Sequence, residues 1–162
     1  MSVPLIDPKD YPTDRIVLDL DGIQKLIPHR YEFTQVHSIL HWDEEKKFCV
    51  GFRKGQENDF WERGHVPGRP IFPGVLMVEA MAQTGVVFSF AKLGVKEYHD
   101  WIGFAGFDGV RFRDAVGPNE DLWMPGHITR VNAKRGYIRW EGQVIRSNGE
   151  LIAEANILGM PF

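Results

Sequence analysis

The sequence predicts an α+β fold in which an antiparallel sheet of about six strands wraps a long central helix. Three observations lead to this prediction. One apolar segment, 73–90, is long enough for a buried helix. Six other segments alternate between apolar and polar residues, and short links join most of these six segments. Sequential strands that are joined by short turns must be antiparallel. The single apolar helix is then the natural core for the sheet.

The start of the chain is predicted to be an arm followed by a short helix. Prolines oppose regular structure within residues 1–14, and residues 15–20 are compatible with a short strand. Asp21, followed three residues later by Gln24, resembles a helix start, and Pro28 ends the helix. The apolar residues of this helix recur at helical spacing: Ile23, Leu26 and Ile27.

Six later segments have the alternation that is typical of strands. They are 33–41, 46–54, 101–112, 121–131, 137–146 and 151–158. Residues 43–45 turn the chain between the first two, and the Asn148-Gly149 pair suits a tight hairpin between the last two. Pro125-Gly126 interrupts the fourth segment, which predicts a bulge or an edge position there.

The segment 64–83 joins a stiff loop to the apolar helix and reads GHVPGRPIFPGVLMVEAMAQ. Its prolines fix backbone angles, and Pro73 suits the first turn of a helix. Glu79 and Gln83 lie one helical turn apart and therefore share a face. An unpaired buried carboxylate is costly, so Glu79 requires a donor, a water-filled pocket or a raised pKa. A site and a core glutamate that bonds nearby backbone are both compatible with this spacing.

Composition and length exclude several classes of protein. The chain has 162 residues, which predicts one domain, 1–162, with an N-terminal arm over 1–20. A net charge of -3 argues against nucleic-acid binding, and the polar interruptions of the apolar helix argue against membrane insertion. The only cysteine, Cys49, cannot form an intrachain disulfide. Because the N-terminus also lacks the pattern of a signal peptide, we expect a cytoplasmic protein.

Three stretches of the chain together form a specific set: LIPHRYEF, the GHVPGRPIFPGVLMVEAMAQ segment and GFDGVRFRDAVGPNEDLW. They resemble the (3R)-hydroxyacyl-[acyl-carrier-protein] dehydratases of the hotdog fold. The resemblance extends from about Leu20 to the C-terminus, and its most specific feature is a histidine followed by three prolines and a helix glutamate. The chain departs from the family at Glu32, where proline is usual, at Pro125-Gly126, and in the arm that precedes the family's start.

The resemblance implies roles for five residues. His65 matches the catalytic histidine, and Glu79 matches the helix glutamate that completes the site from the neighbouring subunit of a homodimer. Gly74 and Val75 match the helix N-terminus, where the Gly74 amide would polarise the thioester carbonyl. Gln83 matches the glutamine that supports the glutamate. His37 and His41 share one face of a predicted strand, but no further Cys, Asp or Glu pattern completes a metal site, so we expect neither a metal nor another cofactor.

The implied function is dehydration of (3R)-3-hydroxyacyl-[acyl-carrier-protein] to the trans-2-enoyl form in fatty acid biosynthesis. A sister family that also isomerises the double bond has Asp at the position of Glu79 and an acidic residue at that of Arg69, so the dehydratase-only branch fits better. The implied partner is the acyl carrier protein, and the implied assembly is a homodimer with composite active sites, which in this family also forms a hexamer.

The implied chemistry suits these residue types. A neutral imidazole, with an unperturbed pKa of about 6.5, is a suitable base near pH 7. Free amides at a helix N-terminus stabilise a developing enolate oxygen. We further expect the pKa of Glu79 to be raised by an apolar pocket. The acyl chain requires an apolar tunnel, for which the candidates are also ordinary core residues: Met77, Met81, Phe88, Phe90 and Phe107.

Two other functions remain compatible with the sequence. In a hotdog acyl thioesterase, Glu79 would activate a water molecule that attacks the thioester carbonyl, and release of free thiol would identify this activity. A non-catalytic acyl-binding hotdog protein would neither hydrate an enoyl thioester nor release thiol. The pairing of His65 with Glu79 favours the dehydratase, because a binder has no use for a base and an acid.

Overall fold

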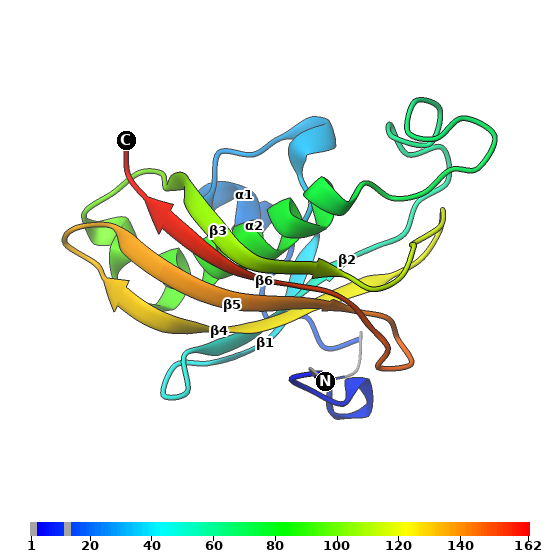
Figure 1. Cartoon of the computed structure of the whole chain (residues 1–162). Coiled ribbons are helices and arrows are strands. Elements are labelled where there is room, and N and C mark those ends of the chain that lie inside the picture. Colours follow the sequence, from blue (N-terminus) through cyan, green and yellow to red (C-terminus); the bar gives the residue numbers. More distant parts are fainter. Residues whose placement is uncertain (1–2, 12–13) are drawn as a thin grey trace.

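The computed structural model describes residues 3–11 and 14–162. Figure 1 shows the arrangement of its elements along the chain. The two α-helices are α1 (Leu20–Leu26) and α2 (Gly74–Lys92), and three short 3-10 helices cover Pro8–Asp10, Tyr31–Phe33 and Val95–Glu97. The strands are β1 (Ser38–Asp43), β2 (Phe48–Arg53), β3 (Gly103–Phe112), β4 (Leu122–Asn132), β5 (Tyr137–Ile145) and β6 (Leu151–Met160).

The strands form one antiparallel sheet in the order β1-β2-β4-β5-β6-β3. The sheet curves around α2, and α1 packs beside that helix (Figure 1). The predicted α+β class and the sheet around a long central helix are therefore confirmed. The prediction of a single domain is not tested by these observations and stays a prediction.

The helix α2 is buried because almost every face of it is apolar. Met77, Met81 and Phe88 are each at most 2% exposed within the main core. Gly85 allows the helix to approach the sheet, since a Cβ there would lie 2.9 Å from the indole of Trp140. This helix is long and apolar enough to cross a membrane, but most of it is enclosed by the protein, as is usual for a core helix.

The N-terminal predictions were partly wrong. Residues 15–20 form no strand beyond a single bridge between Leu18 and Ile39. The cap of α1 is Asp19, whose carboxylate accepts a hydrogen bond from the Gly22 amide at 2.9 Å, rather than Asp21. The arm is also less irregular than its prolines suggest, because Pro8–Asp10 forms a 3-10 turn. Pro12, one of the prolines on which that prediction depended, lies outside the described residues.

The first strand begins later than predicted, at Ser38 rather than residue 33. The reason is that a side chain of α2 makes hydrogen bonds to this segment's backbone, which a neighbouring strand would otherwise make. Gln83 donates to the Phe33 carbonyl at 2.7 Å and accepts from the Gln35 amide at 2.9 Å. Because these backbone groups are satisfied by a side chain, the segment can turn at Tyr31–Phe33 instead of extending the sheet.

Pro125 lies inside the sheet, which the sequence did not predict. It belongs to β4, between β2 and β5, and pairs with Val50 without a register shift at that point. On the β5 side, Trp123 pairs with Ile145 and Gly126 with Gly142. The bulge of β4 comes later, between Ile128 and Arg130. Gly126 is needed for packing, since a Cβ there would overlap the indole of Trp140.

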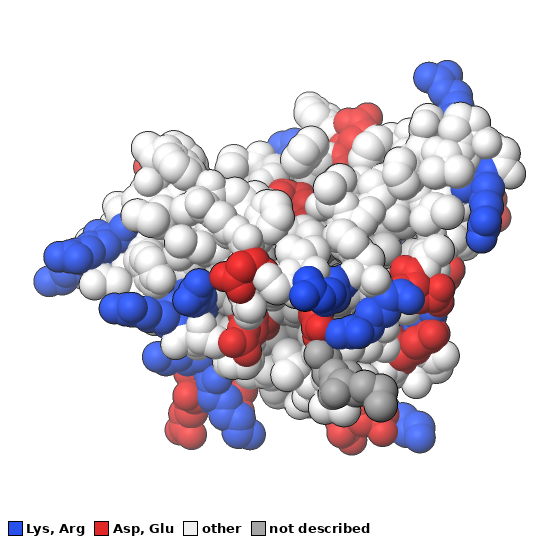
Figure 2. Space-filling model, viewed as in Figure 1, with Lys and Arg blue, Asp and Glu red and all other residues white. Residues whose placement is uncertain are grey.

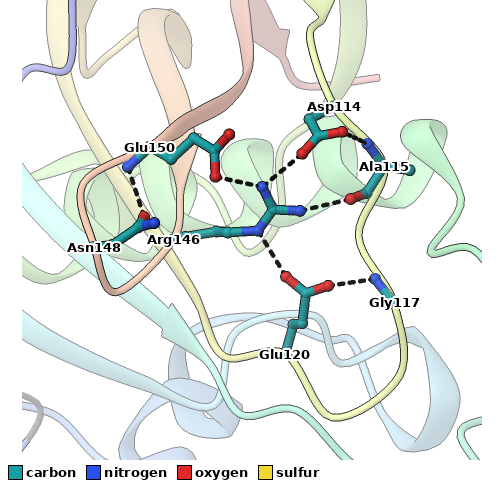
Figure 3. Close-up of polar contacts among 7 residues, drawn as sticks. All are labelled: Asp114, Ala115, Gly117, Glu120, Arg146, Asn148 and Glu150. Carbon is teal, nitrogen blue, oxygen red and sulfur yellow. Dashed lines mark hydrogen bonds and ion pairs between the residues drawn. The ribbon is translucent and has the colours of Figure 1, made fainter.

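An ion cluster around Arg146 fixes the segment between β3 and β4. Its guanidinium donates to Asp114 at 2.7 Å, to Glu120 at 2.7 Å, to Glu150 at 2.6 Å and to the Ala115 carbonyl at 2.6 Å (Figure 3). Three of these partners lie between β3 and β4, and the fourth lies in the β5–β6 hairpin. The cluster therefore ties that connection to the hairpin.

Candidate active site

His65 lies in a loop that leads from β2 to the start of α2. This loop projects beyond the sheet at the N-terminal end of α2 (Figure 1). The His65 amide donates to the Trp61 carbonyl at 2.7 Å, and Nδ1 of its ring lies 2.6 Å from the Ile71 carbonyl. The loop therefore holds the histidine at both its backbone and its ring.

The hydrogen bond to Ile71 determines which ring nitrogen of His65 is free. A carbonyl oxygen can only accept, so Nδ1 carries the proton and donates it to Ile71. In the neutral ring, Nε2 then keeps its lone pair. Because the His65 side chain is exposed, Nε2 is available to take a proton from a bound molecule.

The N-terminus of α2 leaves two backbone amides without intrahelical partners. Pro73 is the N-cap residue and supplies no side-chain hydrogen bond. The amides of Leu76 and Met77 already donate to the Pro73 carbonyl, at 2.9 and 3.3 Å. The amides of Gly74 and Val75 precede them, and Val75 is 74% exposed. These two amides can therefore bind an oxygen that gathers negative charge.

Glu79 is the acidic group of an apolar cavity. The cavity has a volume of about 220 Å³ and lies between α2 and strands β3, β5 and β6. One Glu79 oxygen accepts a hydrogen bond from Gln83 at 2.7 Å and lies 3.3 Å from Nε2 of His29. The glutamate is thus held by side chains and faces a cavity, so the interpretation of a core glutamate bonded to backbone is wrong.

The pKa of Glu79 is lowered, whereas the sequence analysis expected it to be raised. Burial does raise the pKa of this carboxyl. The hydrogen bonds from His29 and Gln83 and the charge of His29 together outweigh burial. Glu79 is therefore an ionised carboxylate near neutral pH, and it loses its charge only when the pH falls through this lowered pKa.

His29 was missed as a site residue. His29 lies in a turn 50 positions before Glu79, and no local pattern in the sequence joins the two. In the structure, its side chain lines the cavity, and its Nδ1 is buried without a hydrogen-bond partner among the described residues. The neighbouring Arg30 holds this turn through the carbonyls of Gln24, Ile27 and His29.

The chain brings Glu79 and Gln83 together but leaves His65 outside their cavity. The cavity lining includes Glu79 and Gln83, whereas His65 is exposed in its loop. The candidate tunnel residues are not in the lining either. Met77, Met81, Phe88 and Phe90 are buried core, and Phe107 is 61% exposed on the edge strand β3. The apolar lining comes instead from other residues: Val86, Ile102, Phe104, Ile138, Trp140 and Ile157.

Removal of His29 is expected to raise the pKa of Glu79. In His29→Ala, only the hydrogen bond from Gln83 still lowers the pKa of Glu79, while burial continues to raise it. The balance therefore shifts toward the neutral carboxyl. NMR titration of the carbon-13-labelled Glu79 carboxyl measures this, and the signal that disappears in Glu79→Gln identifies the resonance. His29→Gln retains a donor and should produce a smaller shift. An unchanged Glu79 titration in His29→Ala would show that His29 does not stabilise the carboxylate.

Comparison with solved structures places the chain in the hotdog fold. The dehydratase heterocomplex ApeI:P from Xenorhabdus doucetiae matches with a TM-score of 0.71 and 13% identity, over 86% of this chain and 91% of that chain. A hypothetical thioesterase from Streptococcus pneumoniae, solved with coenzyme A, matches with a TM-score of 0.56 and 11% identity, over 75% and 82%. At these identities, the matches show the fold alone. Fold and cavity together define a hotdog protein with a carboxylate in an apolar pocket.

Sequence comparison gives the family. A family model described as a FabA-like domain matches residues 27–156. The 3-hydroxyacyl-[acyl-carrier-protein] dehydratase FabZ of Bacillus pumilus is 41% identical over 142 residues, which are 87% of this chain and 94% of that protein. FabZ of Erwinia tasmaniensis is 36% identical over 146 residues, which are 90% and 94%. The chain belongs to the 3-hydroxyacyl-[acyl-carrier-protein] dehydratase family of hydro-lyases.

Proposed function

We propose that this protein removes water from (3R)-3-hydroxyacyl-[acyl-carrier-protein] to form the trans-2-enoyl thioester in fatty acid biosynthesis. The observation that carries this proposal is an ionised carboxylate, Glu79, held by two side chains in an apolar cavity. An apolar cavity suits an acyl chain, and a fixed carboxylate at its wall suits the hydroxyl group of that chain. The family membership supports the same activity.

In the proposed mechanism, Nε2 of His65 takes the proton from C2 of the substrate. The Gly74 amide, with that of Val75 beside it, binds the thioester oxygen as it gains negative charge. Glu79 accepts a hydrogen bond from the 3-hydroxyl and so orients it. The C3–O bond then breaks, the C2=C3 double bond forms, and the hydroxide leaves as water. Because Glu79 is ionised, the proton for this water comes from the imidazolium of His65.

A second copy of the chain completes the proposed site. His65 lies outside the cavity of its own chain, so the histidine that acts there belongs to a partner. The edge strand β3 supports such a dimer, since among the described strands it pairs only with β6. It exposes Phe104, Phe107 and Phe112 by 39%, 61% and 51%, and Figure 2 shows few charged side chains over β3 and α2. Pairing of two such edges would bury these rings.

The acyl carrier protein is the proposed partner that delivers the substrate, and the cytoplasm is the proposed compartment. The names of the similar FabZ proteins support the carrier. The buried thiol of Cys49, whose pKa is raised by burial, is compatible with a reducing compartment. We also propose that residues 1–162 form one domain with an arm over 1–20, and that the homodimer can assemble further into a hexamer.

The reverse reaction gives a direct test of the proposed function. The purified protein is mixed with a trans-2-enoyl thioester of the carrier protein, and the loss of enoyl absorbance is followed. We expect hydration to the (3R)-hydroxyacyl product without release of free thiol. Release of thiol would instead identify a thioesterase. Absence of both reactions would favour an acyl-binding protein and would contradict the proposal.

A further inference from the structure

Arg53 is a buried cation that lies between the loop of His65 and the support of Glu79. It ends β2, and the residue is only 4% exposed. Its guanidinium bonds the carboxylate of Asp59, and its Nε donates to the Gln35 side-chain oxygen at 3.1 Å. The guanidinium carbon also lies 4.4 Å from the centre of the Phe72 ring. Three contacts in three directions therefore fix this side chain.

Two of these contacts lead to the loop of His65. Asp59 lies in that loop, two residues before Trp61, whose carbonyl accepts the His65 amide. The rings of Trp61 and Phe72 pack edge to face, with centroids 5.5 Å apart. Phe72 directly follows the residue whose carbonyl binds the His65 ring. Both ends of the segment that carries His65 are therefore anchored next to Arg53.

The third contact leads to Glu79. The Gln35 side chain accepts from Arg53, and the Gln35 backbone amide donates to the Gln83 side chain at 2.9 Å. Gln83 in turn donates to Glu79 at 2.7 Å. Gln35 and Gln83 are each only 1% exposed, so no water competes with these bonds. Gln35, through its side chain on one side and its backbone amide on the other, thus connects Arg53 by way of Gln83 to the carboxylate.

We propose that Arg53 is a positioning residue for both catalytic groups of the chain. Through Asp59 and Phe72 it sets the loop of His65, and through Gln35 it sets the amide that orients Glu79. This inference rests on the proposed function of His65 and Glu79. The planar guanidinium is required because it bonds two partners while it stacks on a ring, which a lysine cannot do.

The loop of His65 is also held by the connection between β3 and β4, which the Arg146 cluster fixes. The Phe72 amide donates to the Val116 carbonyl at 2.7 Å, and Val116 lies in the connection that Arg146 fixes (Figure 3). At the other end of the loop, the Gly55 amide donates to Asp121 at 2.8 Å. Arg53 therefore acts on a loop whose ends are already fixed, so loss of its contacts should shift the loop rather than unfold it.

Arg53→Lys is the first test. It keeps the positive charge beside Asp59 but removes the planar guanidinium that bonds two partners and stacks on the Phe72 ring. We expect kcat for enoyl thioester hydration to fall by about 10- to 100-fold, as for misplaced catalytic groups, while KM changes by less than about threefold. Arg130→Lys is the matched control. Arg130 also stacks on an aromatic ring, that of Tyr137 at 5.5 Å, but its side chain is exposed and should not affect kcat.

A second variant removes the buried ion pair completely. Arg53→Met combined with Asp59→Leu leaves no unpaired buried charge, and such replacements often preserve stability. We expect this double variant to fold and to lose kcat as Arg53→Lys does. If wild-type protein hydrates the substrate and both variants keep kcat within about twofold, the positioning role is wrong.

A readout without turnover separates this inference from the proposed function. The NMR signals of the His65 ring and of the Glu79 carboxyl should both shift in Arg53→Lys. Neither signal should shift in Arg130→Lys. Unchanged signals in Arg53→Lys would overturn the inference even if the wild-type protein were inactive on every thioester. Shifted signals in an inactive wild-type protein would support the positioning role and contradict only the proposed function.

Discussion

His65→Ala is expected to lower kcat by about 10²- to 10⁴-fold, the usual contribution of a general base, without unfolding the protein. In the proposed mechanism no other group of the chain takes the C2 proton. The fold should survive because the His65 side chain is exposed and its ring makes one hydrogen bond, to the Ile71 carbonyl. The hydration rate of a 2-enoyl thioester and the midpoint of thermal unfolding measure the two effects separately.

His99→Ala is the control for this loss. Like His65, His99 bonds a backbone carbonyl through one ring nitrogen, that of Lys134 at 3.0 Å. It lies outside the cavity lining, so its removal should leave kcat unchanged. Near-normal turnover in His65→Ala would refute the role of His65 as base. An equal loss in His99→Ala would mean that the effect of His65→Ala is not specific to the site.

The fold was predictable because its elements follow local periodicity. The strands that became β2, β4, β5 and β6 differ from their predicted bounds by only a few residues, since alternation is a property of the segment itself. Pro125 shows the limit of this reasoning. Local rules exclude proline from the interior of a sheet. Here a residue of another strand, Trp140 of β5, packs against Gly126 and fixes this stretch of β4, which local rules do not take into account.

The candidate site was predictable only where its residues share one segment. Glu79 and Gln83 are one helical turn apart, so their contact follows from spacing. The contact of Glu79 with His29 and the link from Gln83 through Gln35 to Arg53 join segments that are far apart in sequence. Only the folded chain brings them together. The contact with His29, together with the hydrogen bond from Gln83, lowers the pKa of Glu79, which is why a rule based on burial alone predicted the wrong direction.

Mixing two inactive variants is expected to restore activity if the active sites are shared between subunits. In a hybrid dimer of His65→Ala and Glu79→Gln chains, one site carries both substitutions. The other site combines the intact His65 of one chain with the intact Glu79 of its partner. When equal amounts of the two variants exchange subunits freely, half of the dimers are hybrids with one working site in two, so about a quarter of wild-type activity should return.

The double variant, with both substitutions in one chain, is the control for this mixing experiment. Mixed with wild-type chains, it forms hybrids in which each site has lost one of the two groups, so no hybrid should be active. Sites contained within one subunit predict the opposite pattern. The two single variants would then show no recovery, and each hybrid of wild-type and double-variant chains would keep one active site. The two mixtures thus distinguish a composite site from a site within one chain, although all four chains share the same fold.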